Sequence, residues 1–177
     1  MGGTVSMSVM SGVLGGCKAG PATAEFVPQT VNAAQNDLVT VIAELIIPET
    51  DTPGAKAARV NAFIDKMLTD WFPQDERDHF MAGLATVDTR SQDAYGKPFM
   101  DATPDEQTEL LTAMDAEAMD APGGPPGSPP PFFRMMKELT LFGYYTSEVG
   151  ATQELRDMPF GEYRGSVPYD ELGRAWA

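Results

Sequence analysis

The sequence predicts an all-α fold: a single domain of five or six helices with a Pro/Gly-rich loop and an irregular, extended C-terminal tail. Three observations support this prediction. Apolar residues recur at helical spacing on both sides of a short turn near residue 50, and a capping box opens another helix at Thr103. No stretch sustains the period-two alternation of a half-buried strand. A chain of 177 residues is long enough to bury one real core, so a second domain is not needed.

Two amphipathic helices are predicted to meet at a corner, residues 46–55. The first covers residues 31–47, and the second starts at Pro53 and continues to residue 72. Pro48 ends the first helix because it lacks an N–H, while Pro53 fixes φ in the first turn of the second, with Thr52 as its N-cap. The expected apolar stripes are Leu38, Val41, Ile42, Leu45 and Ile46 on the first helix, and Val60, Phe63, Ile64, Met67, Leu68 and Trp71 on the second.

A third and a fourth helix follow the corner. The third is predicted over residues 74–89, with acidic residues early, where they suit the positive end of the helix. The fourth begins at Thr103, because Thr103 and Glu106 form a capping box and Pro104 suits the first helical position. The side chains expected to point inward are Phe80, Leu84, Val87, Leu110, Leu111 and Met114.

The C-terminal part alternates between helix and irregular structure. Residues 120–131 are rich in Pro and Gly and predict an exposed loop. A fifth helix is expected over residues 131–141 with Gly143 as its stop, and a short helix should run on to residue 155, capped by the hydroxyl residues of the 144–151 segment. The tail, residues 156–177, contains Gly and Pro every few residues but also aromatic side chains, which predicts an extended segment lying on a surface.

Composition excludes several classes of function. The 12 Lys and Arg against 26 Asp and Glu give a formal charge of −14, so the chain lacks the basic patch that binds nucleic acid or an anionic membrane. One cysteine, Cys17, cannot form an internal disulfide or a thiolate cluster, and one histidine, His79, cannot form a His-rich metal site. No dinucleotide or haem-attachment motif occurs. We therefore expect no catalytic, cofactor-binding or metal-binding residues in this chain.

Residues 1–21 are expected to be the remnant of an export signal, followed by a helical domain over residues 22–177. The run Leu14-Gly15-Gly16-Cys17 is similar to a bacterial lipoprotein cleavage box, which makes Cys17 a candidate for lipidation. The alternative is a Gly-rich terminus with an incidental cysteine. The segment is too short to span a bilayer, which takes about 20 apolar residues.

Few residues could carry chemistry. Ser147 or Cys17 would need a base to act as a nucleophile, and the one imidazole, His79, lies on the polar side of the third helix. Glu49 and Asp51 could act as general acid and base or bind calcium, but the corner lacks the spaced ligands of a calcium loop. Capping and turn formation explain these residues better. The aromatic residues of the C-terminal part admit two interpretations, core packing or a partner surface.

Several motifs together resemble the gluconate 2-dehydrogenase subunit 3 family, over most of residues 38–165. The most specific are IIPETDTPGA at 46–55, V-x-x-FID at 60–65 and GYYTSEVGA at 143–151. Supporting motifs are F-x-x-GL at 80–84, GKPF at 96–99, the Leu110-Leu111 pair and FFRMMKELTLF at 132–142.

This resemblance implies a non-catalytic small subunit of a bacterial, membrane-associated sugar or glycoside dehydrogenase. The expected partner is a large FAD-dependent subunit of the glucose-methanol-choline type, often with a c-type cytochrome that takes the electrons. The small subunit of such complexes typically carries a twin-arginine export signal and helps the large subunit to mature, which implies a periplasmic location. No twin arginine precedes the apolar segment here, so the export role rests on a start upstream of Met1 or a partly removed signal.

The resemblance and the aromatic content together predict partner-binding residues in the corner, in the 143–151 motif and in the tail. The predicted residues are Pro48, Asp51, Pro53, Tyr144, Tyr145, Phe160, Tyr163, Tyr169 and Trp176. Two alternatives are a free-standing periplasmic lipoprotein and a self-sufficient acid–base enzyme that uses the corner carboxylates.

Overall fold

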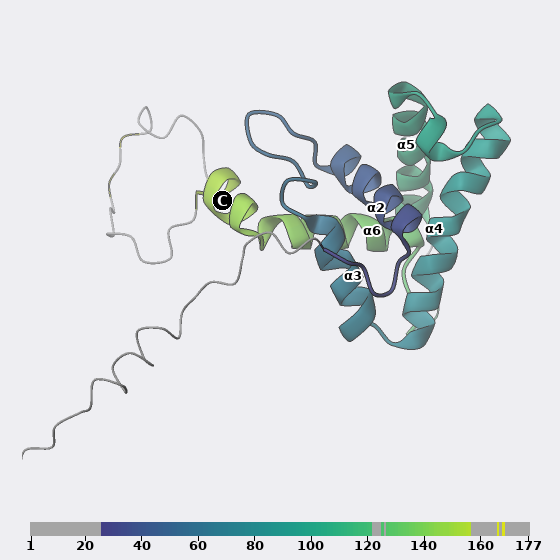
Figure 1. Ribbon diagram of the computed structural model, residues 1–177, viewed down its shortest axis with the longest axis horizontal. Helices are drawn as coiled ribbons and strands as arrows, with labels where there is room; N and C mark the ends of the chain where they lie inside the picture. Colours follow the sequence, from purple (N-terminus) through teal and green to yellow (C-terminus); the bar gives the residue numbers. More distant parts are fainter. Residues whose placement is uncertain (1–25, 122–124, 126, 157–165, 167, 169–177) are drawn as a thin grey trace, which may run out of the picture.

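The computed structural model describes residues 26–121, 125, 127–156, 166 and 168 (Figure 1). Within these residues the chain is helical and contains no strand, and it forms a single domain, which confirms the predicted fold class. The helices in chain order are α2 (Ala33–Ile46), α3 (Val60–Asp70), α4 (Gln74–Tyr95), the short 3₁₀ helix η1 (Phe99–Asp101), α5 (Pro104–Asp120), α6 (Phe132–Tyr145) and the short π-helix η2 (Gly150–Glu154).

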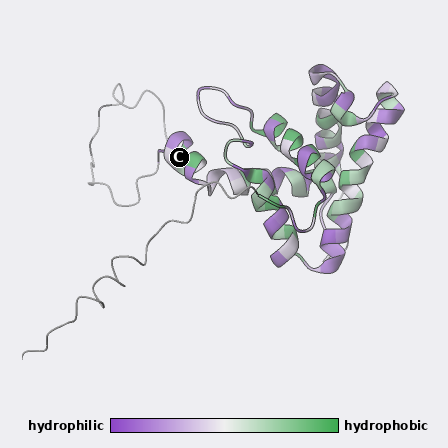
Figure 2. Cartoon of the chain, viewed as in Figure 1, coloured by the Kyte–Doolittle hydropathy of each residue, from purple (hydrophilic) through white to green (hydrophobic). Residues whose placement is uncertain are grey.

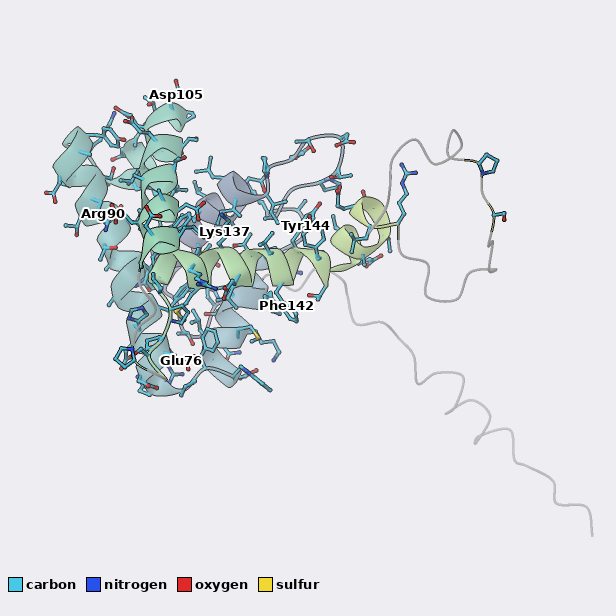
Figure 3. All side chains as sticks on the ribbon, turned by 180° about the vertical axis from the view of Figure 1, so that it is seen from behind. Glu76, Arg90, Asp105, Lys137, Phe142 and Tyr144 are labelled. Carbon is cyan, nitrogen blue, oxygen red and sulfur yellow. The ribbon has the colours of Figure 1, made fainter. Side chains whose placement is uncertain are left out.

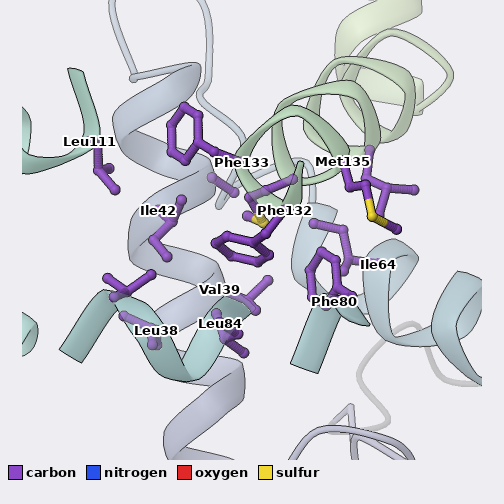
Figure 4. Packing of buried hydrophobic residues seen from close by; sticks show 14 of the residues in the cluster. Leu38, Val39, Ile42, Ile64, Phe80, Leu84, Leu111, Phe132, Phe133 and Met135 are labelled. Carbon is purple, nitrogen blue, oxygen red and sulfur yellow. The ribbon is translucent and has the colours of Figure 1, made fainter. Parts of the chain in front are cut away.

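Helix α6 is the centre of the fold. It packs against α2, α3, α4 and α5, and its sequence has apolar residues on most sides, which is the pattern of a buried helix. Phe132 packs edge-on against Phe80 of α4, while Phe133, Ile42 and Leu111 converge from three helices (Figure 4). The outer helices α4 and α5 carry many hydrophilic residues on their exposed sides (Figure 2). The inward residues predicted for α4 and α5 are all buried.

The start of α3 differs from the prediction. The helix begins at Val60 and not at Pro53, and residues 55–59 form turns that end in a left-handed Arg59 with φ of 56°. Thr52 does not cap the helix. Backbone groups of residues 47–56 make non-helical hydrogen bonds instead. The Ala55 N–H donates to the Ile47 carbonyl at 2.9 Å, and the Pro53 carbonyl accepts from the Tyr144 hydroxyl. Trp71, predicted on the apolar stripe, is exposed beyond the end of the helix.

Gly143 does not end the fifth helix, because α6 continues through it to Tyr145. A Cβ atom at residue 143 would lie 2.6 Å from Cδ1 of Phe63 on α3, closer than real Cβ contacts allow. The glycine is therefore required where α3 and α6 approach each other closely, and not as a helix stop. Glycine in a helix interior costs about 0.5–1 kcal/mol relative to alanine, which this close packing offsets.

The other boundaries lie close to those predicted. Helix α4 runs six residues further than expected, from Thr89 to Tyr95, and ends at Gly96, whose φ of 70° forms the left-handed cap. The capping box of α5 is present, since the Thr103 hydroxyl accepts from Glu106 N–H and Glu106 accepts from Thr103 N–H. The short helix predicted up to residue 155 is η2, and Ser147 Oγ accepts the Gly150 N–H before it.

Candidate partner-binding surface

The corner has a fixed shape because one carboxylate bonds both of its ends. Glu44, in the last turn of α2, accepts the Glu49 N–H at 2.9 Å through Oε1 and the Lys56 N–H at 2.8 Å through Oε2. A Cβ atom on Gly54 would collide with this carboxylate, so only glycine fits there. The backbone N–H groups of Glu49 and Lys56, which have no partner in a helix, thus find an acceptor in the Glu44 side chain.

The corner is also joined to the C-terminal end of α6 and to η2. Tyr144 Oη donates to the Pro53 carbonyl at 2.8 Å, and Thr52 Oγ1 donates to Glu154 Oε2 at 2.9 Å. These bonds connect residues 91 and 102 positions apart in the sequence. The two segments that carry the most specific sequence motifs therefore form one continuous region, which we call the corner surface: residues 46–55 together with 144–154 (Figure 1).

The predicted partner-binding residues occupy different places in this surface. Pro48 and Asp51 are exposed on the loop, Pro53 is half-buried, and Tyr145 is 40 % exposed. Tyr144 is 1 % exposed, so in this chain its ring packs in the core and its hydroxyl holds the corner. The remaining predicted residues lie outside the described part of the chain: Cys17, Phe160, Tyr163, Tyr169 and Trp176.

Asp65 of α3 is a structural residue that the sequence analysis missed. Its side chain is 2 % exposed, and its two oxygens accept the backbone N–H groups of Gln29, Thr30 and Val31 at 2.8, 2.9 and 3.0 Å. The carboxylate thereby fastens the segment before α2 to α3. The signal in the sequence was the charged residue that closes the otherwise apolar V-x-x-FID motif.

The described groups considered for catalysis, Glu49, Asp51, His79 and Ser147, are not assembled into a reactive site. Glu49 and Asp51 are exposed on the loop, and Asp51 accepts a hydrogen bond from the neighbouring Thr50 hydroxyl at 3.1 Å. His79 Nε2 is bonded to the Pro130 carbonyl at 3.0 Å, and Ser147 Oγ to the Tyr144 carbonyl at 2.6 Å. Among the described residues, no three His, Cys, Asp or Glu side chains are grouped so that they could hold a metal ion.

The two lowered carboxyl pKa values among the described residues, those of Glu106 and Glu117, both belong to α5. The hydrogen bond from Lys97, 2.7 Å away, together with the Thr103 N–H, lowers the pKa of Glu106. The hydrogen bond from Arg90, also 2.7 Å away, lowers the pKa of Glu117. The Arg90–Glu117 pair joins α4 to α5, and the Lys97–Glu106 pair joins the segment after α4 to α5. Both pairs are partly exposed, so these shifts report structural ion pairs rather than chemistry.

No described helix is both long enough and apolar enough to span a bilayer. A family model described as gluconate 2-dehydrogenase subunit 3 matches residues 33–162. The match includes the corner, all of α3 to α6, and η2. No curated protein and no solved structure gives a match to the chain.

Proposed function

Because the chain belongs to the gluconate 2-dehydrogenase subunit 3 family, we propose that it is the non-catalytic small subunit of a dehydrogenase complex. Its partner in this proposal is a large FAD-dependent sugar or glycoside dehydrogenase subunit of the glucose-methanol-choline type. The small subunit binds the flavoprotein and supports its maturation, stability and export to the periplasm. FAD belongs to the large subunit, and a c-type cytochrome accepts the electrons where a third subunit is present.

The observation that carries this proposal is the corner surface. Hydrogen bonds made by Tyr144 and Thr52 join two motifs that are far apart in the sequence. Several loop and helix residues of the joined region are exposed to solvent. The Tyr144 hydroxyl and the Glu44 carboxylate hold the loop in one conformation. A recognition surface benefits from this, since binding is stronger when the bound conformation is already formed. The described residues at this surface supply shape and charge rather than a nucleophile beside a base.

Co-expression tests the proposal. The proposed FAD-dependent large subunit is produced with and without this chain, and three quantities are measured: co-purification, FAD content and sugar-dependent reduction of a dye. We expect the two chains to co-purify, and the large subunit to gain FAD and activity when the small one is present. The small subunit alone should reduce no dye.

Dye reduction by the small subunit on its own would contradict the non-catalytic role. Failure of the two chains to associate, with the large subunit equally active in both preparations, would contradict the accessory role.

A further inference from the structure

A groove runs along the outer side of α3. Its cavity has a volume of about 420 Å³, and occupied binding sites typically measure about 300–1,000 Å³. Four lining residues follow one another at helical spacing from the N-cap of α3 to its last residue: Arg59, Ala62, Lys66 and Asp70. The cavity is therefore elongated, about 16 Å along the helix axis, and we call it the α3 groove.

The segment before α2 forms another wall of the α3 groove. Phe26 and Gln29 line the groove, and Asp65 of α3 accepts the backbone N–H groups of residues 29–31. Asp65 is only 2 % exposed, so its carboxylate would lose all three donors in a buried place if this segment moved away. The wall is thus a fixed part of the folded domain.

The chain itself leads into the α3 groove. Phe26 is the first described residue and is half-buried, so residue 25 is attached at the groove wall. Four extended residues span about 13 Å, which is close to the length of the groove. Residues 22–25 read Ala-Thr-Ala-Glu, three small side chains followed by one carboxylate. Their attachment point and their length both fit the groove.

Arg59 supplies a positive charge at one end of the α3 groove. Its side chain is exposed, and in the described part of the chain it takes part in no ion pair. The other cation of the groove, Lys66, is already paired with Asp70 at 2.6 Å. Arg90 of α4 and Lys137 of α6, both labelled in Figure 3, are paired with carboxylates of α5. Arg59 is therefore the cation of the groove that a carboxylate can still neutralise.

We propose that residues 22–25 lie in the α3 groove and that the Glu25 carboxylate pairs with Arg59. The groove then fixes the point at which residues 1–21 leave the domain. A second copy of the chain fits less well, because the formal charge of −14 on each copy opposes association. This inference does not rest on the proposed function, since both partners belong to one chain.

A glutamate-specific protease tests the position of residues 22–25. Glu25 is a natural cleavage site, and Ser11→Glu supplies a matched site in the same full-length chain, well before the proposed segment. In the folded chain, cleavage after residue 25 should be about 10-fold slower or more than cleavage at position 11, because a protease cuts a bound segment only when it opens locally. After unfolding in urea, the two sites should be cut at similar rates.

Charge reversal tests the ion pair, with amide exchange of residues 22–26 as the measurement. Arg59→Glu should speed this exchange about 3-fold or more, and Arg59→Gln should speed it less, as expected for loss of a partly exposed pair. Lys56→Glu is the matched control, because Lys56 is also exposed but does not line the groove. Combining Arg59→Glu with Glu25→Arg should restore the slow exchange. Thermal unfolding checks that each variant is folded.

Three results would overturn the proposal. Equal cleavage of the two sites in the folded chain would place residues 22–25 outside the α3 groove. Equal exchange in the Arg59 and Lys56 variants would show that Glu25 and Arg59 do not pair. Protection that disappears on dilution would identify the same segment of a second copy as the occupant. None of these results depends on the flavoprotein, so the proposed function is judged separately.

Discussion

At the scale of single residues, two buried side chains, Asp65 and Tyr144, and the half-buried carboxylate of Glu44 bond backbone groups outside the helices. Asp65 binds the backbone before α2, Tyr144 binds the backbone of the corner, and Glu44 closes the corner itself. Each group satisfies backbone donors or acceptors that have no helical partner. For the buried Asp65 and Tyr144, removing the side chain therefore costs more than the bond contributes, because the backbone partner is left unpaired away from water.

Asp65→Ala is expected to lower the free energy of unfolding by about 3 kcal/mol or more, because three backbone N–H groups lose a charged acceptor. Urea denaturation measures the change. Asp37→Ala is the control, since Asp37 is an exposed acid on α2 and should have almost no effect. Equal stability of the two variants would show that residues 29–31 do not depend on this carboxylate.

At the scale of elements, the corner is the part of the fold whose structure differs most from local expectation. Its two prolines and its Thr and Asp residues are typical of a helix end followed directly by a helix start. Instead, residues 47–59 form an ordered connection held by α2, α6 and η2. The corner is therefore stable only while α6 is docked beside it.

Tyr144→Phe tests this dependence. Loss of the hydroxyl leaves the Pro53 carbonyl without its donor, and we expect the free energy of unfolding to fall by about 1 kcal/mol. Amide exchange in residues 47–56 should become faster as well. Tyr145→Phe removes an exposed hydroxyl from the neighbouring ring and should change neither quantity. Identical exchange in both variants would mean that the corner keeps its shape without the bond.

At the scale of the whole molecule, the chain is strongly acidic, and several of its Lys and Arg side chains form ion pairs between different elements of the fold. Arg90 pairs with Glu117 and joins α4 to α5, and Lys97, which follows α4, pairs with Glu106 in the first turn of α5. Lys137 pairs with Asp115 and joins α5 to α6. Helix α5 buries only Leu110, Leu111, Met114 and Ala118, so these pairs add to a narrow apolar contact. They also place carboxylates where a nearby cation offsets the excess negative charge.

The pH dependence of stability should reflect the pair between Lys97 and Glu106. The pKa of Glu106 lies below its ordinary value of 4.5, so the pair stabilises the fold above that pH. This stabilisation is lost as the pH falls through the lowered pKa, because Glu106 then becomes neutral in the folded state. Urea denaturation from pH 7 to pH 3 should show a shallower acid loss for Glu106→Gln than for the wild type.

Asp105→Asn serves as the control for this experiment. It removes one negative charge from the same helix turn, and within the described residues Asp105 takes part in no ion pair, so its acid loss should match that of the wild type. If Glu106→Gln also matched the wild type, the ion pair would make no contribution to the acid sensitivity.

The sequence by itself determined the all-α fold class, the inward faces of α4 and α5, and the start of α5. Each of these depends on residues within a few positions of one another: the Thr103 and Glu106 capping box, or apolar side chains that repeat every three or four residues. Short contiguous motifs also indicated the family resemblance, and the family match over residues 33–162 confirms it.

Only the tertiary structure decided the rest. Pro53 does not start a helix because Tyr144, 91 residues away, binds its carbonyl, and Gly143 does not stop one because the Phe63 ring occupies the space of a Cβ. The packing of α6 also buries Tyr144 and leaves Leu141, Phe142 and Tyr145 exposed. Local sequence patterns do not predict such partners, because they are distant in the sequence. Helix packing alone determines which side chain fills a given space.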